Sequence, residues 1–374
     1  MKPITLTILS LLLAIAPLTT GQEPGTEDRR ADKPVSLKPT GEKRLGSLEE
    51  EYLSDGSYPE LEVSRIAFGS CYRPKSRHRK GELWDVWKVI KAEDPHVMLL
   101  LGDNHYADSQ TPEKIEGGYK GLEADREYMD FREEVPTFAV WDNHDYAAKY
   151  PGKDFEHAAK SEELFLEHFR VPERDPRQTR EGVYGSWIFG ERPNRIQIIM
   201  LDGHRHRDRL PGRNGNFHSD PDPEKTFLGA GQWEWLEKQL AKEAEVRVIG
   251  SPIQVLSREH KWRRWDMFPK QRDRLLELVR GASGTTVFLS GDRHRGEISR
   301  LSEEGRKPVC DVTASGYFHV REAEEANSLR VGKLINQPHF GAIEVDWEKR
   351  TVVMKVVCSR EGTALVEHTE SILP

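Results

Sequence analysis

The chain has 374 residues, which suits one large domain or two small ones with a substantial core. Charged residues make up 32% of it and the mean hydropathy is −0.71, so most of the surface is expected to face water. The net charge of −7 argues against a protein that binds nucleic acid through a broad basic face.

The N-terminus has the pattern of a secretory signal. A lysine gives a positive start, and residues 4–15 are mostly apolar. Thr19 and Gly21 are the small residues expected before a cleavage site at Gln22. An uncleaved membrane anchor is the alternative, although the apolar run is short for one. We therefore predict that residues 1–21 are removed and that the protein is secreted or periplasmic, with no stable membrane span.

Residues 22–60 are rich in charged residues, Pro and Gly, and poor in large apolar side chains. A segment of this composition cannot offset the entropy cost of ordering, so it is predicted to be a disordered polar linker. It is also too short to be a separate globular module. The catalytic domain is expected to comprise residues 61–374.

Apolar runs that predict buried strands alternate with segments of helical spacing in this domain. The predicted strands are 63–69, 97–101, 137–141, 196–201, 246–249 and 286–289. The predicted helices are 81–93, 231–242 and 269–280. The alternation indicates an α/β core, in which ligands gather at the carboxyl ends of the strands. The C-terminal runs 342–347 and 351–357 predict an antiparallel hairpin with one solvent-exposed face.

The chain has three cysteines, Cys71, Cys310 and Cys358. In an oxidising compartment two of them could pair and leave one free. Cys310 and Cys358 lie in β-like runs, whereas Cys71 stands apart at a strand end, so Cys71 is the expected free thiol. The alternative is that all three are small buried hydrophobic side chains.

Residues suited to binding metals or phosphate follow four of the strands. They are Cys71, Asp103 with Tyr106, Asn143 with His144, and Asp292 with His294. A single Asp at a strand end means little, because Asp is common in turns. Four such ends on one edge of a sheet are much harder to obtain by accident, and together they predict a single site.

These residue types suit a two-metal hydrolase. Asp103 can bridge two cations, and Tyr106 and Cys71 suit a strongly Lewis-acidic metal such as ferric iron, because coordination deprotonates a phenol or thiol. Asn143 offers a neutral ligand or a donor to phosphate, and His144 could protonate a leaving alkoxide. Water activated by the metals would be the nucleophile. In agreement, the sequence has neither a Gly-x-Ser-x-Gly motif nor a P-loop.

In their order along the chain, these motifs resemble those of the PhoD-like (alkaline phosphatase D) branch of the calcineurin-like metallophosphoesterases. The matching stretches are 68–71 (Phe-Gly-Ser-Cys), 102–106 (Gly-Asp-Asn-His-Tyr), 141–145 (Trp-Asp-Asn-His-Asp), 231–236 and 289–294 (Leu-Ser-Gly-Asp-Arg-His). The resemblance extends from about residue 61 to about residue 298. Any one motif would be weak, but the ordered set is specific.

The resemblance implies a four-layer α/β sandwich of two mixed β-sheets flanked by helices. It implies a ferric iron site formed by Cys71, Asp103, Tyr106 and His294. It also implies a second metal, expected to be calcium, at Asp103, Asn143 and Asp292. His144 corresponds to the residue near the leaving group.

The sequence departs from the family pattern in three places. The family usually has Asp at the position of Asn143, so the site loses a negative charge, which could change the second metal. Residues 22–60 leave no room for the extra N-terminal β-domain that the family often has. His204 and His206 follow Asp202 and are tempting ligands, but we expect both to be solvated loop residues.

Basic residues gather after three strands, although the protein is acidic. They are Arg73, Lys75, Arg77, Arg79 and Lys80 after the first strand; Arg205, Arg207, Arg209 and Arg213 after Asp202; and Arg258, Lys261, Arg263 and Arg264 after the strand at 246–249. The hypothesis is that these loops recruit anionic phosphate esters, with Arg205 as a substrate-binding residue. The alternative is three independent solvated loops.

The sequence therefore predicts an exported metal-dependent phosphoesterase acting on monoesters, diesters or both. A phosphodiesterase or phospholipase acting on a polymeric or lipid substrate is the alternative. A non-catalytic binding module on the same fold is a third reading, and the presence of Asp103, His144 and Asp292 argues against it.

Overall fold

The computed structural model describes residues 52–73, 84–148, 150–213, 215–220, 222 and 224–374. The predicted signal at 1–21, most of the predicted linker, and the basic residues Lys75, Arg77, Arg79 and Lys80 lie outside this part of the chain. The described helices include none that is both long and apolar enough to cross a membrane.

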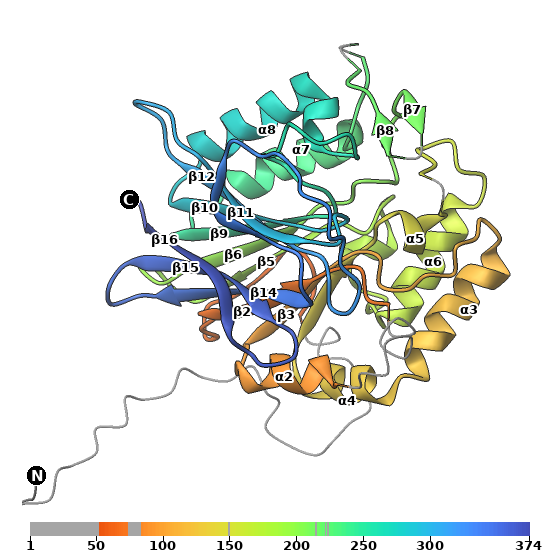
Figure 1. Cartoon of the computed structure of the whole chain (residues 1–374), viewed down its shortest axis with the longest axis horizontal. Coiled ribbons are helices and arrows are strands. Elements are labelled where there is room, and N and C mark those ends of the chain that lie inside the picture. Colours follow the sequence, from red (N-terminus) through yellow and green to blue (C-terminus); the bar gives the residue numbers. More distant parts are fainter. Residues whose placement is uncertain (1–51, 74–83, 149, 214, 221, 223) are drawn as a thin grey trace, which may run out of the picture. The chain divides into compact units, whose positions relative to one another are not determined.

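Two mixed β-sheets form the centre of the described fold (Figure 1). The larger sheet has eight described strands in the order β1 (Gly56–Tyr58), β5 (Gly185–Phe189), β6 (Ile196–Met200), β9 (Val246–Ser251), β10 (Thr285–Ser290), β12 (Val309–Ala314), β11 (Gly296–Leu301) and β13 (Arg330–Ile335). The smaller has six in the order β16 (Ala364–Ser371), β15 (Thr351–Cys358), β14 (His339–Asp346), β2 (Arg65–Gly69), β3 (Val97–Leu101) and β4 (Thr137–Val140).

Helices cover the outer faces of both sheets. They are α2 (Val86–Ala92), α3 (Pro112–Glu123), α4 (Arg126–Glu134), α5 (Asn143–Tyr146), α6 (Ala158–His168), α7 (Gly229–Leu240) and α8 (Pro269–Gly281). Figure 1 shows α7 and α8 beside the larger sheet and α2 and α4 beside the smaller. Trp233 of α7 and Leu275 of α8 share a buried cluster with Phe288 of β10, and Trp87 of α2 packs on Phe131 of α4. The predicted four-layer sandwich is therefore confirmed.

Parallel strands bring the motif-bearing loops to one edge of each sheet. β2, β3 and β4 are parallel neighbours in the smaller sheet, and β6, β9 and β10 are parallel neighbours in the larger. The residues of β3 and β10 are all buried, as their continuous apolar runs predict. The predicted C-terminal hairpin is the antiparallel pair β14 and β15, which extends the smaller sheet next to β2.

Several residues before position 61, where the catalytic domain was predicted to begin, belong to the described fold. Tyr52 is buried and packs edge-on against Phe138 and Phe189, and β1 pairs in parallel with β5. Ser54 donates from both its backbone nitrogen and its hydroxyl to Asp175, at 2.8 and 2.7 Å. The linker prediction was therefore wrong for residues 52–60, because this short segment has its own aromatic and polar partners in the core.

All three cysteines lie in the described part of the chain, and all are buried and unpaired. Cys310 is in β12 of the larger sheet, whereas Cys358 ends β15 of the smaller. All three thiols are therefore free in the described structure, Cys71 among them as expected, and the possible disulfide between Cys310 and Cys358 is not present.

Candidate active site

The loops after β2, β3, β4 and β10 pack tightly against one another. The Cys71 amide donates to the Gly102 carbonyl at 3.2 Å. Gly102 has a φ of +94°, and a Cβ there would lie 2.4 Å from the Asp142 nitrogen. A Cβ on Gly291 would lie 2.5 Å from the Ser70 hydroxyl. Glycine is required at both positions because the four loops converge.

Four of the predicted ligands have left-handed backbone conformations, which non-glycine residues rarely adopt. The φ values are 61° at Cys71, 52° at Asp103, 66° at Asp292 and 52° at His294. Each such residue costs of order 1–3 kcal/mol, and such residues cluster at functional sites. Their concentration at the meeting point of two sheets supports a functional role for these loops.

Cys71, Asp103 and Tyr106 form a tight acidic cluster. The Asp103 Oδ2 atom lies 3.5 Å from the Cys71 sulfur and 3.1 Å from the Tyr106 hydroxyl. Burial and the Asp103 carboxylate raise the pKa values of the Cys71 thiol and the Tyr106 phenol well above their ordinary values. Burial, Asp142 and Asp292 raise the pKa of Asp103 itself. A bound cation would reverse all three shifts, so these groups fit a metal site.

His294 and Asp292 enclose the same cluster from β10. The His294 Nδ1 atom lies 3.2 Å from the His319 carbonyl, which can only accept, so Nε2 carries the lone pair. Burial, then His319 and Arg321, lower the pKa of His294 to about 3, which keeps the imidazole in the neutral form that binds metals. Asp292 Oδ2 is buried without a hydrogen-bond partner among the described residues. Cys71, Asp103, Tyr106 and His294 therefore offer donor groups of the kinds that a metal ion binds.

His144 lies at the more open side of this cluster. Its ring packs on Tyr106 with centroids 4.2 Å apart, and its Nδ1 lies 2.6 Å from Asp108. Its backbone nitrogen donates to Asp103 at 3.2 Å, so the loop after β4 is tied to the loop after β3. The imidazole is about one-quarter exposed, and Nε2 is the nitrogen left to meet a substrate.

The pocket predicted for the second metal already contains a cation of the chain. The Arg263 Nη2 atom lies 2.6 Å from Asn143 Oδ1, 2.5 Å from Asp292 Oδ1 and 2.9 Å from Asp142 Oδ2. Arg263 is buried, with a relative exposure of 2%. A second metal bridging Asp103, Asn143 and Asp292 does not fit this arrangement, because the guanidinium occupies Asn143 Oδ1 and Asp292 Oδ1, two of the oxygen atoms that would bind it.

The expectation that His204 is a solvated loop residue was wrong. It is fully buried, and its Nε2 lies 2.6 Å from Asp142 Oδ1 and 3.2 Å from Arg263 Nη1. His206 is partly exposed, and its Nε2 lies 3.2 Å from the Glu181 carbonyl oxygen, away from the Asp103 cluster. Asp142 therefore has a histidine and an arginine as partners, neither of which the sequence motifs identified.

Two further acidic residues organise the loops. Asp145 accepts hydrogen bonds from the backbone nitrogens of Asn104, His105 and Asp142. Asp202 accepts a hydrogen bond from the indole nitrogen of Trp141 at 2.7 Å. Both carboxylates satisfy loop donors, so they shape the site without taking part in it.

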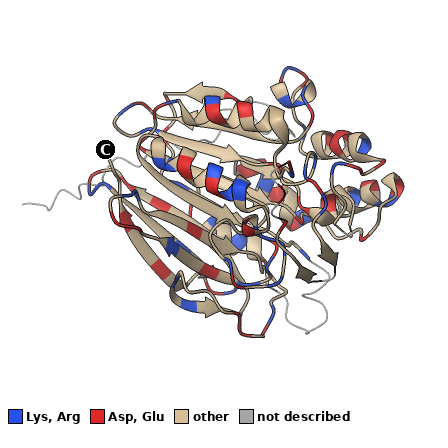
Figure 2. Cartoon of the chain, turned by 90° about the horizontal axis from the view of Figure 1, so that it is seen from above, with Lys and Arg blue, Asp and Glu red and all other residues tan. Residues whose placement is uncertain are grey.

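The basic loops are largely neutralised by acidic neighbours. Arg205 pairs with Glu162 at 3.2 Å and with Glu181 at 2.6 Å, and does not join the Asp103 cluster. Arg207 is buried and donates to backbone carbonyls, including that of Gly203. Figure 2 shows acidic and basic residues interspersed along the helices. In the described part of the loop after Asp202, Arg205 and Arg207 are therefore already engaged, which gives little support to substrate binding by Arg205.

Arg73 is the described basic residue that does reach the cluster. Its guanidinium lies 4.6 Å from the Tyr106 ring centroid and 3.7 Å from Asp108, and its side chain is 40% exposed. It therefore offers a cation at the entrance of the site.

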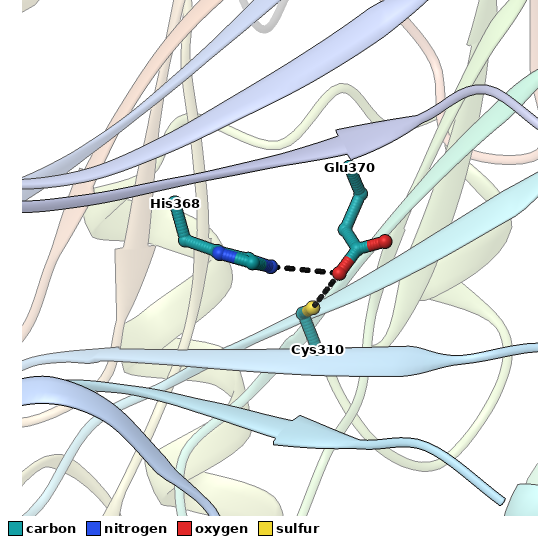
Figure 3. A group of neighbouring side chains, drawn as sticks. All are labelled: Cys310, His368 and Glu370. Atoms are coloured by element: carbon teal, nitrogen blue, oxygen red, sulfur yellow. Dashed lines mark hydrogen bonds and ion pairs between the residues drawn. The ribbon is translucent and has the colours of Figure 1, made fainter.

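A second group of possible metal ligands lies away from this site. Cys310, His368 and Glu370 have ligand atoms within 4.8 Å of one another, and no other trio of His, Cys, Asp and Glu in the described chain is as close (Figure 3). Arg300 also pairs with Glu370, and burial with Glu370 raises the pKa of Cys310 to about 12. The carboxylate thus already has a counter-ion and the thiol stays protonated, so the group links β12 to β16.

Comparison with known protein families identifies this architecture. The family model for the PhoD-like phosphatases matches residues 66–320. The chain belongs to the PhoD-like phosphatase family. Membership makes it a phosphoric ester hydrolase, as the arrangement of its strand-end motifs predicted. The match spans the loops after β2, β3, β4 and β10 that carry the candidate ligands. No curated protein sequence matches the chain.

Solved structures share the fold at low sequence identity. The structure of PhoD is 16% identical with a TM-score of 0.67, over 85% of this chain and 70% of PhoD. A purple acid phosphatase, PPD1, from yellow lupin seeds is 15% identical with a TM-score of 0.56, over 84% and 55% of the two chains. GAP50, the anchor in the inner membrane complex of Plasmodium, is 13% identical with a TM-score of 0.53, over 84% and 90%.

Proposed function

We propose that this protein is an exported phosphoesterase that hydrolyses phosphate monoesters, diesters or both, using ferric iron held by Cys71, Asp103, Tyr106 and His294. The observation that carries the proposal is the buried cluster of thiol, carboxylate and phenol, Cys71, Asp103 and Tyr106. The pKa values of all three groups are raised in the absence of a cation, and a bound cation would lower them. When bound, such a metal supplies Lewis acidity that activates water and polarises the phosphoryl group.

The residues around the cluster have separate tasks in this proposal. Asp108 lies 2.6 Å from Nδ1 of His144, so Nε2 is the nitrogen that can hydrogen-bond the oxygen of the leaving group. Arg73 lies beside Tyr106 and can pair with a non-bridging phosphate oxygen. The loops after β3 and β4 hold these groups in place through the Asp103 contact with the His144 backbone.

Metal analysis together with a visible spectrum of the purified protein tests the proposed site. Tyrosinate bound to ferric iron is expected to give a charge-transfer colour. A colourless and iron-free protein with full activity would overturn the roles of Cys71 and Tyr106. Rates on nitrophenyl phosphate and on bis-nitrophenyl phosphate, measured on the same sample, would separate monoesterase from diesterase preference.

Export is proposed from residues 1–21 and has its own test. Expression of the full chain in a Gram-negative host, followed by fractionation and N-terminal sequencing, is expected to give periplasmic protein that begins at Gln22. Protein that keeps its first residues and stays with the cytoplasm would contradict the proposal.

A further inference from the structure

The second cation position of the site is occupied by the guanidinium of Arg263, which makes four hydrogen bonds to three side chains. Nη1 donates to Asp142 Oδ1 at 2.8 Å, and Nη2 donates to Asp142, Asn143 and Asp292. Asn143 and Asp292 are two of the residues expected to hold a second metal. A planar guanidinium with several fixed donors is well suited to bind such a set of oxygens.

The chain around Arg263 holds the guanidinium in this position. Trp265, two residues later, is fully buried, donates its indole to Ser251 at 3.0 Å and packs on Phe227 with ring centroids 4.3 Å apart. The guanidinium also lies 4.6 Å from the centroid of the Tyr150 ring. An anchored loop on one side and an aromatic ring on the other restrict the ways in which the side chain could leave.

The charges of the pocket are also less favourable to a divalent metal than they are in the usual family pattern. Asn143 is neutral, so the pocket has one negative charge fewer than it would have with Asp at that position. Asp142 and Asp292 are the two carboxylates that Arg263 contacts in this pocket. The guanidinium therefore offsets one of their two negative charges.

We infer that this protein binds one metal rather than two, and that Arg263 takes the place of the second. The inference rests on the proposed metal site at Cys71, Asp103, Tyr106 and His294 and states how the neighbouring pocket works. Arg263 acts here as a positioning residue: it neutralises and orients Asn143 and Asp292 beside the metal. Because arginine is permanently charged, Asn143 and Asp292 have a cationic partner whether or not metal ions are available.

Counting metals tests the inference without relying on hydrolysis. Wild-type protein, the Arg263→Ala variant and the Arg263→Lys variant would be dialysed against excess calcium or manganese chloride, desalted and analysed by mass spectrometry for metals. Wild type is expected to hold one metal ion per chain. Arg263→Ala is expected to hold one more, because Asp142 and Asp292 lose their cation, whereas Arg263→Lys keeps a positive charge and is expected to stay at one.

Arg264→Ala is the matched control. Arg264 is the next residue and also a partly buried arginine, but it pairs with Asp266 and the His260 carbonyl instead of the site. This variant is expected to keep the wild-type metal content. Circular dichroism would verify that each variant is folded.

Two metal ions per wild-type chain would overturn the inference, even if Arg263→Ala does not fold. A folded Arg263→Ala variant that binds no additional calcium or manganese would also overturn it. The proposed function fails separately, if metal-loaded wild-type protein hydrolyses neither nitrophenyl substrate. Metal content and hydrolysis therefore distinguish the failure of one proposal from the failure of the other.

Discussion

Two pockets adjoin Asp103, and they handle buried negative charge in opposite ways. In the pocket of Cys71, Asp103 and Tyr106, every acidic group has a raised pKa, because burial and mutual repulsion oppose ionisation. In the neighbouring pocket, Arg263 and His204 lower the pKa of Asp142. The first pocket requires a cation from outside, whereas the chain supplies its own cation to the second.

Asp103→Ala should have the largest effect, since Asp103 belongs to the metal pocket and also receives the His144 backbone donor. We expect a loss of about 10³-fold in kcat/KM, together with loss of bound iron. Kinetics on both nitrophenyl substrates and metal analysis measure the two effects. Asp154→Ala, which removes an exposed carboxylate, is the control and should be unchanged. Activity near that of wild type in Asp103→Ala would refute the site.

Tyr106→Phe should affect the metal pocket and spare the Arg263 pocket. Removing the hydroxyl that contacts Asp103 is expected to abolish the visible colour and lower kcat by roughly 10–100-fold. Absorption spectra and initial rates measure this. Tyr317→Phe is the matched control, because Tyr317 is also buried and its hydroxyl has no hydrogen-bond partner among the described residues. An unchanged spectrum in Tyr106→Phe would remove Tyr106 from the ligand set.

Asp175→Asn tests how much a buried ion pair away from the site, Asp175 with Arg177, stabilises the fold. Asp175 is bound by Arg177 and Ser54, and although burial opposes them, these partners lower its pKa from 3.8 to about 2. A depressed pKa means that the stabilisation is present above about pH 4 and is lost as the pH falls towards 2. The variant should lose about 2 kcal/mol of unfolding free energy at pH 7 and show a flatter acid dependence.

Urea unfolding at pH 7 and pH 3 measures both effects of Asp175→Asn. Asp94→Asn removes an exposed partner of Arg65 and should cost less than about 1 kcal/mol. If the two variants lose the same amount, the burial of the Asp175 pair is not what stabilises it.

The smallest expected effect is a change in KM, which should differ between variants of Arg73 and Arg205. Arg73→Ala should raise KM about 3–10-fold and weaken its dependence on salt, because an exposed cation beside Tyr106 is lost. Arg205→Ala should leave KM within about twofold, since Glu162 and Glu181 already neutralise that guanidinium. Michaelis curves at low and high salt would show the difference, and the reverse ranking would restore Arg205 as the substrate-binding residue.

The strands that carry the motif loops, and the loops themselves, could be predicted from the sequence. The apolar run of β3, the mostly apolar centre of β10 and the alternation in the C-terminal hairpin are local patterns with a direct physical meaning. The buried β5 and the largely buried β11 were not among the predicted strands. β13 and β16 were not predicted either. Both carry charged or exposed residues along their length, so neither shows the apolar run of a core strand.

The order of the strand-end motifs by itself predicted the fold and the family, and it supplied the acidic residues of the proposed metal site, because each motif is a few residues long and follows its own strand. Only the tertiary structure decided which cationic side chain pairs with which carboxylate. Arg263 reaches Asp142 across 121 residues of sequence, and in the sequence it is one arginine in a basic loop. Charge pairing depends on distance in space and on burial, which local sequence does not encode, and here it turned a predicted metal pocket into an arginine pocket.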